Sequence, residues 1–296
     1  MPVVPLGRPR DKRAKAVRSA IGLLRENKTA LAGAVIVAVF ALTAVAVYVA
    51  SLFGITLTPY NPIQQDVGPL LAPPSLAHPF GTDLLGRDIF SRIIAATPND
   101  FAIGLVVIGF SLVVGTLVGS YAAFRGGLLD EALMRVTDIF FALPALVLAM
   151  AIGVALGRGI GNMTIALMIV WWPPYARLAR GETLKISHQN FIDAARLFHL
   201  SRLRILLKHV IPNITTTLLV YATLDVGTVI VVYSGLSYLG LAVTPPAPDW
   251  GEMVSSYQAY TISAPWLPLF PGVIIALGVI GFSLLGDGLR DALEVS

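Results

Sequence analysis

Residues of the types that catalyse reactions or bind metals are few in this sequence and far apart. Its four histidines, His78, His188, His199 and His209, do not have the spacing of metal ligands. Cysteine is absent, which excludes a thiol nucleophile, a thiolate metal site and a disulfide framework. The sequence also lacks the glycine-rich P-loop pattern that cradles nucleotide phosphates. We therefore expect no catalytic residues, no metal site and no cofactor in this chain.

The composition indicates that this chain is surrounded largely by lipid. Of its 296 residues, 56% are hydrophobic and 13% are charged, and the mean hydropathy is +0.77. That leaves too little polar surface to cover a soluble globule of this size. A pI near 9.4 can indicate a nucleic-acid-binding protein, but the basic residues lie in loops between apolar runs, so we expect no nucleic-acid partner.

Six apolar runs are long enough to cross a hydrocarbon core of about 30 Å. They lie near 29–53, 100–123, 137–157, 163–178, 214–242 and 268–286. Eight Lys and Arg lie in segment 1–28 and seven lie between Arg177 and Lys208. Because positive loops stay cytoplasmic, we expect an all-α membrane protein with six transmembrane helices and an N-in/C-in topology. Segment 1–28 is then a cytoplasmic basic segment that contacts the lipid surface, and 29–296 is the transmembrane domain.

One ionisable residue, Asp225, lies deep inside a predicted span. It follows Pro212 by about a dozen residues, which at about 1.5 Å per residue places it near mid-membrane. A carboxylate facing lipid is costly there, so we expect Asp225 to face the interior, a water-filled cavity or a neighbouring subunit. The alternative is a structural hydrogen bond to a neighbouring helix. On either interpretation Asp225 is a candidate pathway or intramembrane polar site.

The cytoplasmic loop 179–212 is patterned as two short helices. Asn190 can cap a helix that starts at Phe191, with Asp193 at its positive end, and Ser201 can cap a second helix. In the second helix, one apolar stripe is expected at Leu203, Leu206, Leu207 and Val210. A helical hairpin on the basic side suits the docking of a cytoplasmic protein. The alternative is an amphipathic element that lies on lipid.

Two outer loops are rich in proline, which prevents a continuous helix. The first, at about 54–98, contains HPFGTDLLGRDIFSR from His78 to Arg92, and the last, 243–267, contains TPPAPDWG from Thr244 to Gly251. By residue pattern alone, both loops are ordinary extracytoplasmic turns with interfacial aromatic residues.

Several separated motifs resemble one family. The segment from Phe191 to Asn213, FIDAARLFHLSRLRILLKHVIPN, resembles the EAA loop of ABC-importer permeases. The outer stretches HPFGTDLLGRD and PPAPDWG, with GGLLDEALMR and LGDGLRDAL, resemble the C-type permease subunit of dipeptide/oligopeptide transporters. The resemblance runs in one register from about residue 30 to the end.

This resemblance implies a type I ABC importer permease fold and the bacterial cytoplasmic (inner) membrane. The implied partners are a homologous B-type permease subunit, two cytoplasmic ABC ATPase domains that bind ATP and Mg, and an extracytoplasmic peptide-binding protein. This chain would form half of the translocation pathway for di- or oligopeptides and would couple to the ATPases by alternating access. Related permeases also carry nickel or haem, and the resemblance does not distinguish these substrates.

By the same resemblance, residues 191–200 would be the helix that couples to the ATPases, with Asp193, Ala194 and Ala195 matching the EAA residues. The implied coupling residues are Phe191, Asp193, Ala194, Ala195, Phe198, His199, Leu200 and Ser201. Both alanines would let the helix approach a groove closely, and Phe198 would be an apolar anchor. The chain departs from the family pattern at Asp193, which replaces a longer Glu, and at His199, which stands where the family usually has Gly.

Two other classes remain open at this point. An ion-coupled secondary transporter would have buried ionisable groups in several spans and paired broken helices, whereas only Asp225 is clearly deep in a span. A membrane scaffold or sensor without transport is the other class. Co-purification with ATPases separates the importer from both alternatives.

Overall fold

The structure is a computed structural model that describes residues 27–294, so nearly all of the expected basic segment 1–28 lies outside the described residues. Apart from one isolated bridge between Thr82 and Asp88, the regular structure in this range is helical, which confirms an all-α membrane protein. The helices are α2 (Lys28–Leu52), α3 (Ile89–Arg125), α4 (Gly127–Phe141), α5 (Ala145–Leu156), α6 (Ile160–Ser187), α7 (Asn190–Leu197), α8 (Arg202–Ile205), the π-helix η1 (Leu206–Val210), α9 (Ile211–Tyr238), α10 (Trp250–Tyr257), the 3₁₀ helix η2 (Gln258–Tyr260) and α11 (Trp266–Glu294).

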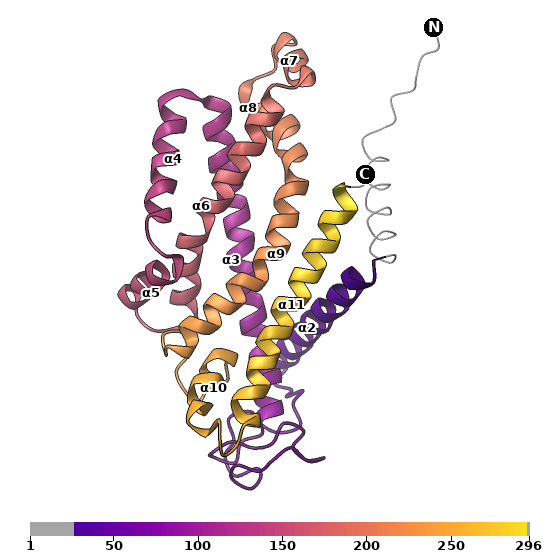
Figure 1. Ribbon diagram of the computed structural model, residues 1–296, viewed down its shortest axis with the longest axis vertical. Helices are drawn as coiled ribbons and strands as arrows, with labels where there is room; N and C mark the ends of the chain where they lie inside the picture. Colours follow the sequence, from indigo (N-terminus) through magenta and orange to yellow (C-terminus); the bar gives the residue numbers. More distant parts are fainter. Residues whose placement is uncertain (1–26, 295–296) are drawn as a thin grey trace.

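The long helices form a bundle with short elements at its two ends (Figure 1). α3 packs extensively on α6, α9 contacts both α3 and α11, and α2 packs on α11. The irregular segment 53–88 and α10 lie at one end, whereas α7 and α8 lie at the other. This arrangement separates the two sets of loops that the sequence singles out.

Two glycines bring α3 and α6 into direct backbone contact. A Cβ atom added to Gly115 would lie 2.4 Å from the Cβ of Tyr175, and one added to Gly119 would lie 1.9 Å from the carbonyl oxygen of Ala176. No other residue fits these positions without displacing α6. The GxxxG spacing is typical of close helix crossings in membranes.

Four stretches of the described residues are long and apolar enough to cross a membrane: α2, α3, Arg202–Tyr238 and Trp266–Ala292. They correspond to the first, second, fifth and sixth expected spans. α3 begins at Ile89, well before the expected start of its span, because protein covers its first turns: Ile89 and Ile93 are buried in a cluster with Met253 and Tyr257.

The span expected near 137–157 is a bent pair of helices in the structure rather than one straight helix. α4 and α5 are bent by 89° at the break between them, and the pair makes a fifth span only if both parts count as one. Pro144 at the N-cap of α5 explains the break, because proline has no N–H to donate and disfavours a helical conformation at Leu143. α4 is tied to α6 by Asp130, which accepts two hydrogen bonds of 2.7 Å from Arg180.

The expected span 163–178 lies inside the longer helix α6, which is not among the four apolar stretches. Its centre holds Trp171, Trp172 and two prolines, which lower its hydropathy. Trp171 and Tyr175 are buried, because α3 and α9 pack around this helix. Since α6 continues to Ser187, the loop expected at 179–212 is shorter than the sequence suggests and begins at residue 188.

Candidate functional site

Residues 188–210 form a helical hairpin that projects from one end of the bundle (Figure 1). Its two arms share a small apolar cluster made of Ile192, Ala195, Ile205, Leu206 and Val210. Phe124 at the end of α3 and Ile186 at the end of α6 pack against this cluster. The hairpin is therefore anchored to two long helices, so that its displacement and theirs are mechanically linked.

The outward face of α7 exposes large apolar side chains. Leu197 is 80% exposed and Phe198 is 81% exposed, and Phe191, Asp193 and Ala194 are exposed beside them. Exposed apolar groups gathered on a projecting element are typical of a protein interface. Phe191, Asp193, Ala194 and Phe198 are thus exposed on α7 together with Leu197, which the sequence analysis does not name.

Ala195 does not belong to this outward face. It is 6% exposed and packs inside the hairpin with Ile192 and Ile205. The expectation that its small side chain faces a partner's groove therefore needs correction. The small size of Ala195 lets α7 approach α8 within this chain, and a bulky residue there would disrupt the hairpin itself.

The helix caps of the hairpin differ from those expected. The N-cap of α7 is Gln189, and Asn190 is the first helical residue, so the expected cap at Asn190 is wrong. Ser201 does stand at the N-cap of α8, but its side chain makes no capping hydrogen bond. Asp193 lies in the first turn of α7 as expected and pairs with Arg196 at 3.1 Å.

The apolar stripe expected in the second arm is only half correct. Leu206 and Val210 are buried, whereas Leu203 and Leu207 are exposed. The cause is the π-helix at Leu206–Val210, in which hydrogen bonds join residues five apart rather than four. Residues four or five apart then share a face, so Ile205 replaces Leu203 in the buried set.

His199 adopts the left-handed conformation that the family's glycine would adopt, with φ at +54°. The backbone N–H of His199 donates to Arg196 O at 2.9 Å, and that of Leu200 donates to Ala195 O at 3.3 Å. These two bonds form a Schellman motif that ends α7. The turn therefore persists without glycine, at the cost of backbone strain at His199.

Asp225 lies on α9 and points toward α6. Its Oδ2 accepts a 2.7 Å hydrogen bond from Trp171 Nε1 and a 3.2 Å hydrogen bond from the Tyr175 hydroxyl. The Tyr175 ring also packs edge-on against Tyr221, with centroids 5.2 Å apart. Asp225 is half-buried, so the structure excludes a carboxylate turned fully toward lipid and contains the interhelical hydrogen bonds of the structural interpretation. A role of Asp225 in the pathway stays a prediction.

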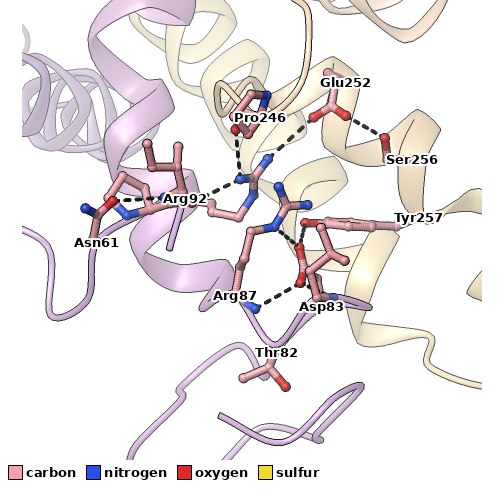
Figure 2. Close-up of polar contacts among 12 residues, drawn as sticks. Asn61, Thr82, Asp83, Arg87, Arg92, Pro246, Glu252, Ser256 and Tyr257 are labelled. Carbon is pink, nitrogen blue, oxygen red and sulfur yellow. Dashed lines mark hydrogen bonds and ion pairs between the residues drawn. The ribbon is translucent and has the colours of Figure 1, made fainter. Parts of the chain in front are cut away.

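Arg92 joins the two proline-rich outer loops, as Figure 2 shows. Its side chain is 1% exposed and donates to the carbonyl oxygens of Pro62 at 3.0 Å and Pro246 at 3.2 Å. It also forms an ion pair with Glu252 at 3.6 Å, and Glu252 accepts a hydrogen bond from Ser256. We call this set, Arg92 with Pro62, Pro246 and Glu252, the outer clasp.

A second set of buried contacts reinforces the outer clasp. Asp83 accepts a 2.6 Å bond from Arg87 Nε and a 3.0 Å bond from the Tyr257 hydroxyl (Figure 2). Burial raises the pKa of Tyr257 above its ordinary value, because it disfavours the phenolate, so Tyr257 acts as a hydrogen-bond donor. Asp88 caps α3 by accepting from Ser91 N at 2.8 Å, and its other oxygen meets His78 Nδ1 at 2.9 Å.

Asp249 fixes the start of α10 against α9. It caps α10 through Glu252 N at 2.9 Å and accepts hydrogen bonds from the hydroxyls of Tyr233 and Ser237. The next residue, Trp250, donates its backbone N–H to Asp100 on α3 at 3.0 Å. The outer loops are therefore a fixed cap on the bundle and not the ordinary turns that the residue pattern suggests.

The hairpin and the outer loops are suited to binding a partner and to transmitting movement between helices, rather than to bond chemistry. Within residues 27–294, no group of three or more His, Cys, Asp or Glu side chains is placed to hold a metal ion. The carboxylates of Asp83, Asp225 and Asp249 accept hydrogen bonds that join separate helices or loops. The bundle thus has an exposed apolar face at the hairpin end and a hydrogen-bonded cap at the other end.

Comparison with known proteins identifies the class. Residues 115–295 match the family described as binding-protein-dependent transport system inner membrane component. The chain belongs to this family. It is therefore a multi-pass permease of an inner membrane, and its class is a non-catalytic subunit with no cofactor of its own. Systems of this kind also comprise ATPases, a binding protein and a partner permease. Membership sets aside the ion-coupled transporter and the scaffold.

Curated relatives of this permease confirm the resemblance to peptide-type permeases. The glutathione transport system permease protein GsiD of Escherichia coli O157:H7 is 40% identical over 255 residues, which cover 86% of this chain and 84% of the relative. The probable D,D-dipeptide transport system permease protein DdpC of Escherichia coli K12 is 38% identical over 243 residues, or 82% of each chain.

The fold of the permease is similar to that in two inward-facing crystal forms of the MetNI methionine ABC transporter. In the native crystal form the TM-score is 0.55 at 20% identity, and the match covers 69% of this chain and 96% of that chain. In the selenomethionine-soaked form the TM-score is 0.57 at 18% identity, with the same coverage. This likeness supports a type I importer permease fold.

The sequence analysis of this permease misses the buried network of the outer cap. A signal for it exists, because Asp83 and Arg87 are four residues apart, as are Asp88 and Arg92, in a loop with few other charges. Opposite charges at that spacing indicate ion pairs on one helical turn. Of these two pairs only Asp83–Arg87 forms, and it closes a loop turn rather than a helical turn. Arg92 instead binds a loop more than 150 residues later, which local spacing cannot indicate.

Proposed function

We propose that this permease carries short peptides, of the glutathione or dipeptide class, into the cell. The observation that supports it is the length and continuity of the similarity to GsiD and DdpC, whose printed names give glutathione and D,D-dipeptides as what their systems transport. Both relatives match over more than four fifths of their length. Glutathione and D,D-dipeptides belong to one substrate class, because both are short peptides with backbone amides and charged termini.

In the proposed assembly, the chain has six spans with both termini inside. The bent pair α4 and α5 supplies the third span and the buried helix α6 the fourth, in addition to the four apolar stretches. Eighteen of the twenty-one Lys and Arg residues then face the cytoplasm. A homologous B-type subunit completes the pathway, two cytoplasmic ATPase domains bind below, and a peptide-binding protein delivers substrate from outside.

The hairpin at residues 188–210 is the proposed ATPase-coupling element. Phe191, Leu197 and Phe198 form the apolar part of its outward face, and Ala194 leaves room for close approach. Asp193 offers a carboxylate to a basic residue of the partner. The anchoring of the inward face to Phe124 and Ile186 would carry movement of the ATPases into α3 and α6. The turn between α7 and α8 consists of His199, Leu200 and Ser201 with the C-cap residue Phe198.

Alternating access follows from this arrangement. ATP-driven closure of the ATPases draws the hairpins of the two permeases together, and the outer ends of the spans separate to receive substrate. The outer clasp keeps α10 and the first outer loop together as one body during that movement. Asp225 lies about midway along α9 and is half-buried. In this proposal its carboxylate pairs with the ammonium group of a peptide in the pathway.

The test is uptake into proteoliposomes that contain the permease with its partner subunits. Labelled glutathione and labelled D-alanyl-D-alanine are offered in the presence of binding protein, with ATP or with an ion gradient alone. We expect ATP-dependent uptake of at least one of them, and loss of that uptake in Ala194→Arg with the ATPases still bound. The matched control is Arg204→Gln, an exposed change on the second arm. Uptake driven by an ion gradient without ATP would refute the proposal.

A further inference from the structure

A basic cavity lies between the end of α3 and the hairpin. It has a volume of about 470 Å³, and its walls include Arg125, Arg196, Arg202 and His199. Arg196 pairs with Asp193, but within residues 27–294 neither Arg125 nor Arg202 has a hydrogen-bond or ion-pair partner on its side chain. Among the described residues, none that lines the cavity is acidic. The cavity therefore offers unmatched guanidinium donors to an anion.

An apolar groove adjoins this cavity. It has a volume of about 270 Å³ and is lined by Tyr121, Phe124, Leu203 and Leu206 together with the same Arg125 and Arg202. From Tyr121 the exposed apolar side of α3 continues through Leu117 and Val113, which are spaced four residues apart along one face of the helix. A charged recess thus opens directly onto an apolar track.

The depth of the site matches a membrane surface. Residues 101–124 of α3 carry no charged side chain, and at about 1.5 Å per residue they extend about 36 Å, slightly more than a hydrocarbon core of about 30 Å. Arg125 directly follows this stretch and lies at the level of the lipid headgroups. Tyr121, one turn before it, is the residue type that favours that interface.

We propose that the cavity binds the phosphate of an anionic phospholipid, with one acyl chain lying along the exposed face of α3. Guanidinium groups match phosphate with paired hydrogen bonds, and basic recesses between helices on the cytoplasmic side suit anionic headgroups. A soluble phosphate offers the same headgroup chemistry, but it would leave the adjoining groove empty. The lipid bridges the end of α3 and the coupling hairpin, so that membrane composition adjusts how firmly the hairpin is held.

Native mass spectrometry of the delipidated transporter, with all subunits present, tests the proposal. The probes are dioleoyl phosphatidylglycerol, its dihexanoyl counterpart and dioleoyl phosphatidylcholine. The Arg125→Gln/Arg202→Gln variant is compared with Arg204→Gln/Lys208→Gln, which removes the same charge from exposed positions that line neither cavity. We expect the first pair to weaken binding of the long-chain anionic lipid about 30-fold and the control pair to change it little.

Each other outcome contradicts the proposal in its own way. Equal weakening by both pairs would indicate general surface attraction rather than a site. Equal binding of the long- and short-chain phosphatidylglycerols, with displacement by inorganic phosphate, would indicate a soluble anion. Unchanged lipid binding by Arg125→Gln/Arg202→Gln with loss of the ATPases would assign the cavity to an acidic group of the partner.

Discussion

Replacing Arg92 with methionine should release the outer loops from each other. Methionine keeps most of the buried stem but removes the hydrogen bonds to Pro62 and Pro246 and leaves Glu252 as a nearly buried carboxylate without its partner. Breaking a buried ion pair from one side costs about 3–5 kcal/mol. At about 1.4 kcal/mol per factor of ten, the open form of the cap should become about 100-fold to several thousandfold more populated.

A single cysteine at Ala264 reports that opening, because the native chain has no cysteine and Ala264 is 1% exposed. A membrane-impermeant maleimide should label Ala264→Cys slowly in the parent and faster by that factor in Arg92→Met, since labelling follows the open population. Arg158→Met, an exposed change, is the control. Adding Glu252→Gln to Arg92→Met should recover part of the protection. Equal labelling of Arg92→Met and Arg158→Met would refute the clasp.

Substitutions at Gly119, His199 and Asp225 test three other parts of the account. Gly119→Leu should destabilise the permease by about 1–3 kcal/mol in thermal unfolding, because the larger side chain would push α3 away from α6. Gly109→Leu is the control and should not destabilise it, because a Cβ added at Gly109 meets nothing within 4 Å. His199→Gly should stabilise the hairpin against proteolysis by about 1 kcal/mol, and His199→Val should weaken it. Asp225→Asn keeps an acceptor for Trp171, so the complex should assemble while uptake falls; unchanged uptake would exclude a charge-dependent role.

The sequence predicts the helices of the bundle where they face lipid, because these helices appear as long apolar runs. The four apolar stretches begin or end close to the expected limits, because a lipid-facing helix must be apolar on its outside. α6 and the α4–α5 pair follow different rules. α6 is covered by protein, so Trp171 and two prolines are tolerated at its centre, and Pro144 breaks the third span in a way that hydropathy alone does not register.

The candidate sites could be predicted only in part, for reasons of geometry. The position of the hairpin and the outward direction of Phe198 agree with the sequence analysis, whereas Ala195 turns inward because the two arms of the hairpin pack on each other. The π-helix shifts the buried face of the second arm, and nothing in the local pattern indicates it. The outer clasp depends on Arg92 and Glu252, which are distant in sequence and meet only in the folded chain.

Photo-cross-linking tests the central claim, that α7 binds the ATPases, most directly. A benzophenone amino acid is placed at Phe198 in one variant and at Ile262 in another; both native side chains are largely exposed apolar groups, but they lie at opposite ends of the molecule. On illumination of the intact transporter, we expect the probe at Phe198 to cross-link to an ATPase subunit and the probe at Ile262 not to do so. Absence of an ATPase cross-link at Phe198 in an intact complex, or its presence at Ile262, would contradict the account.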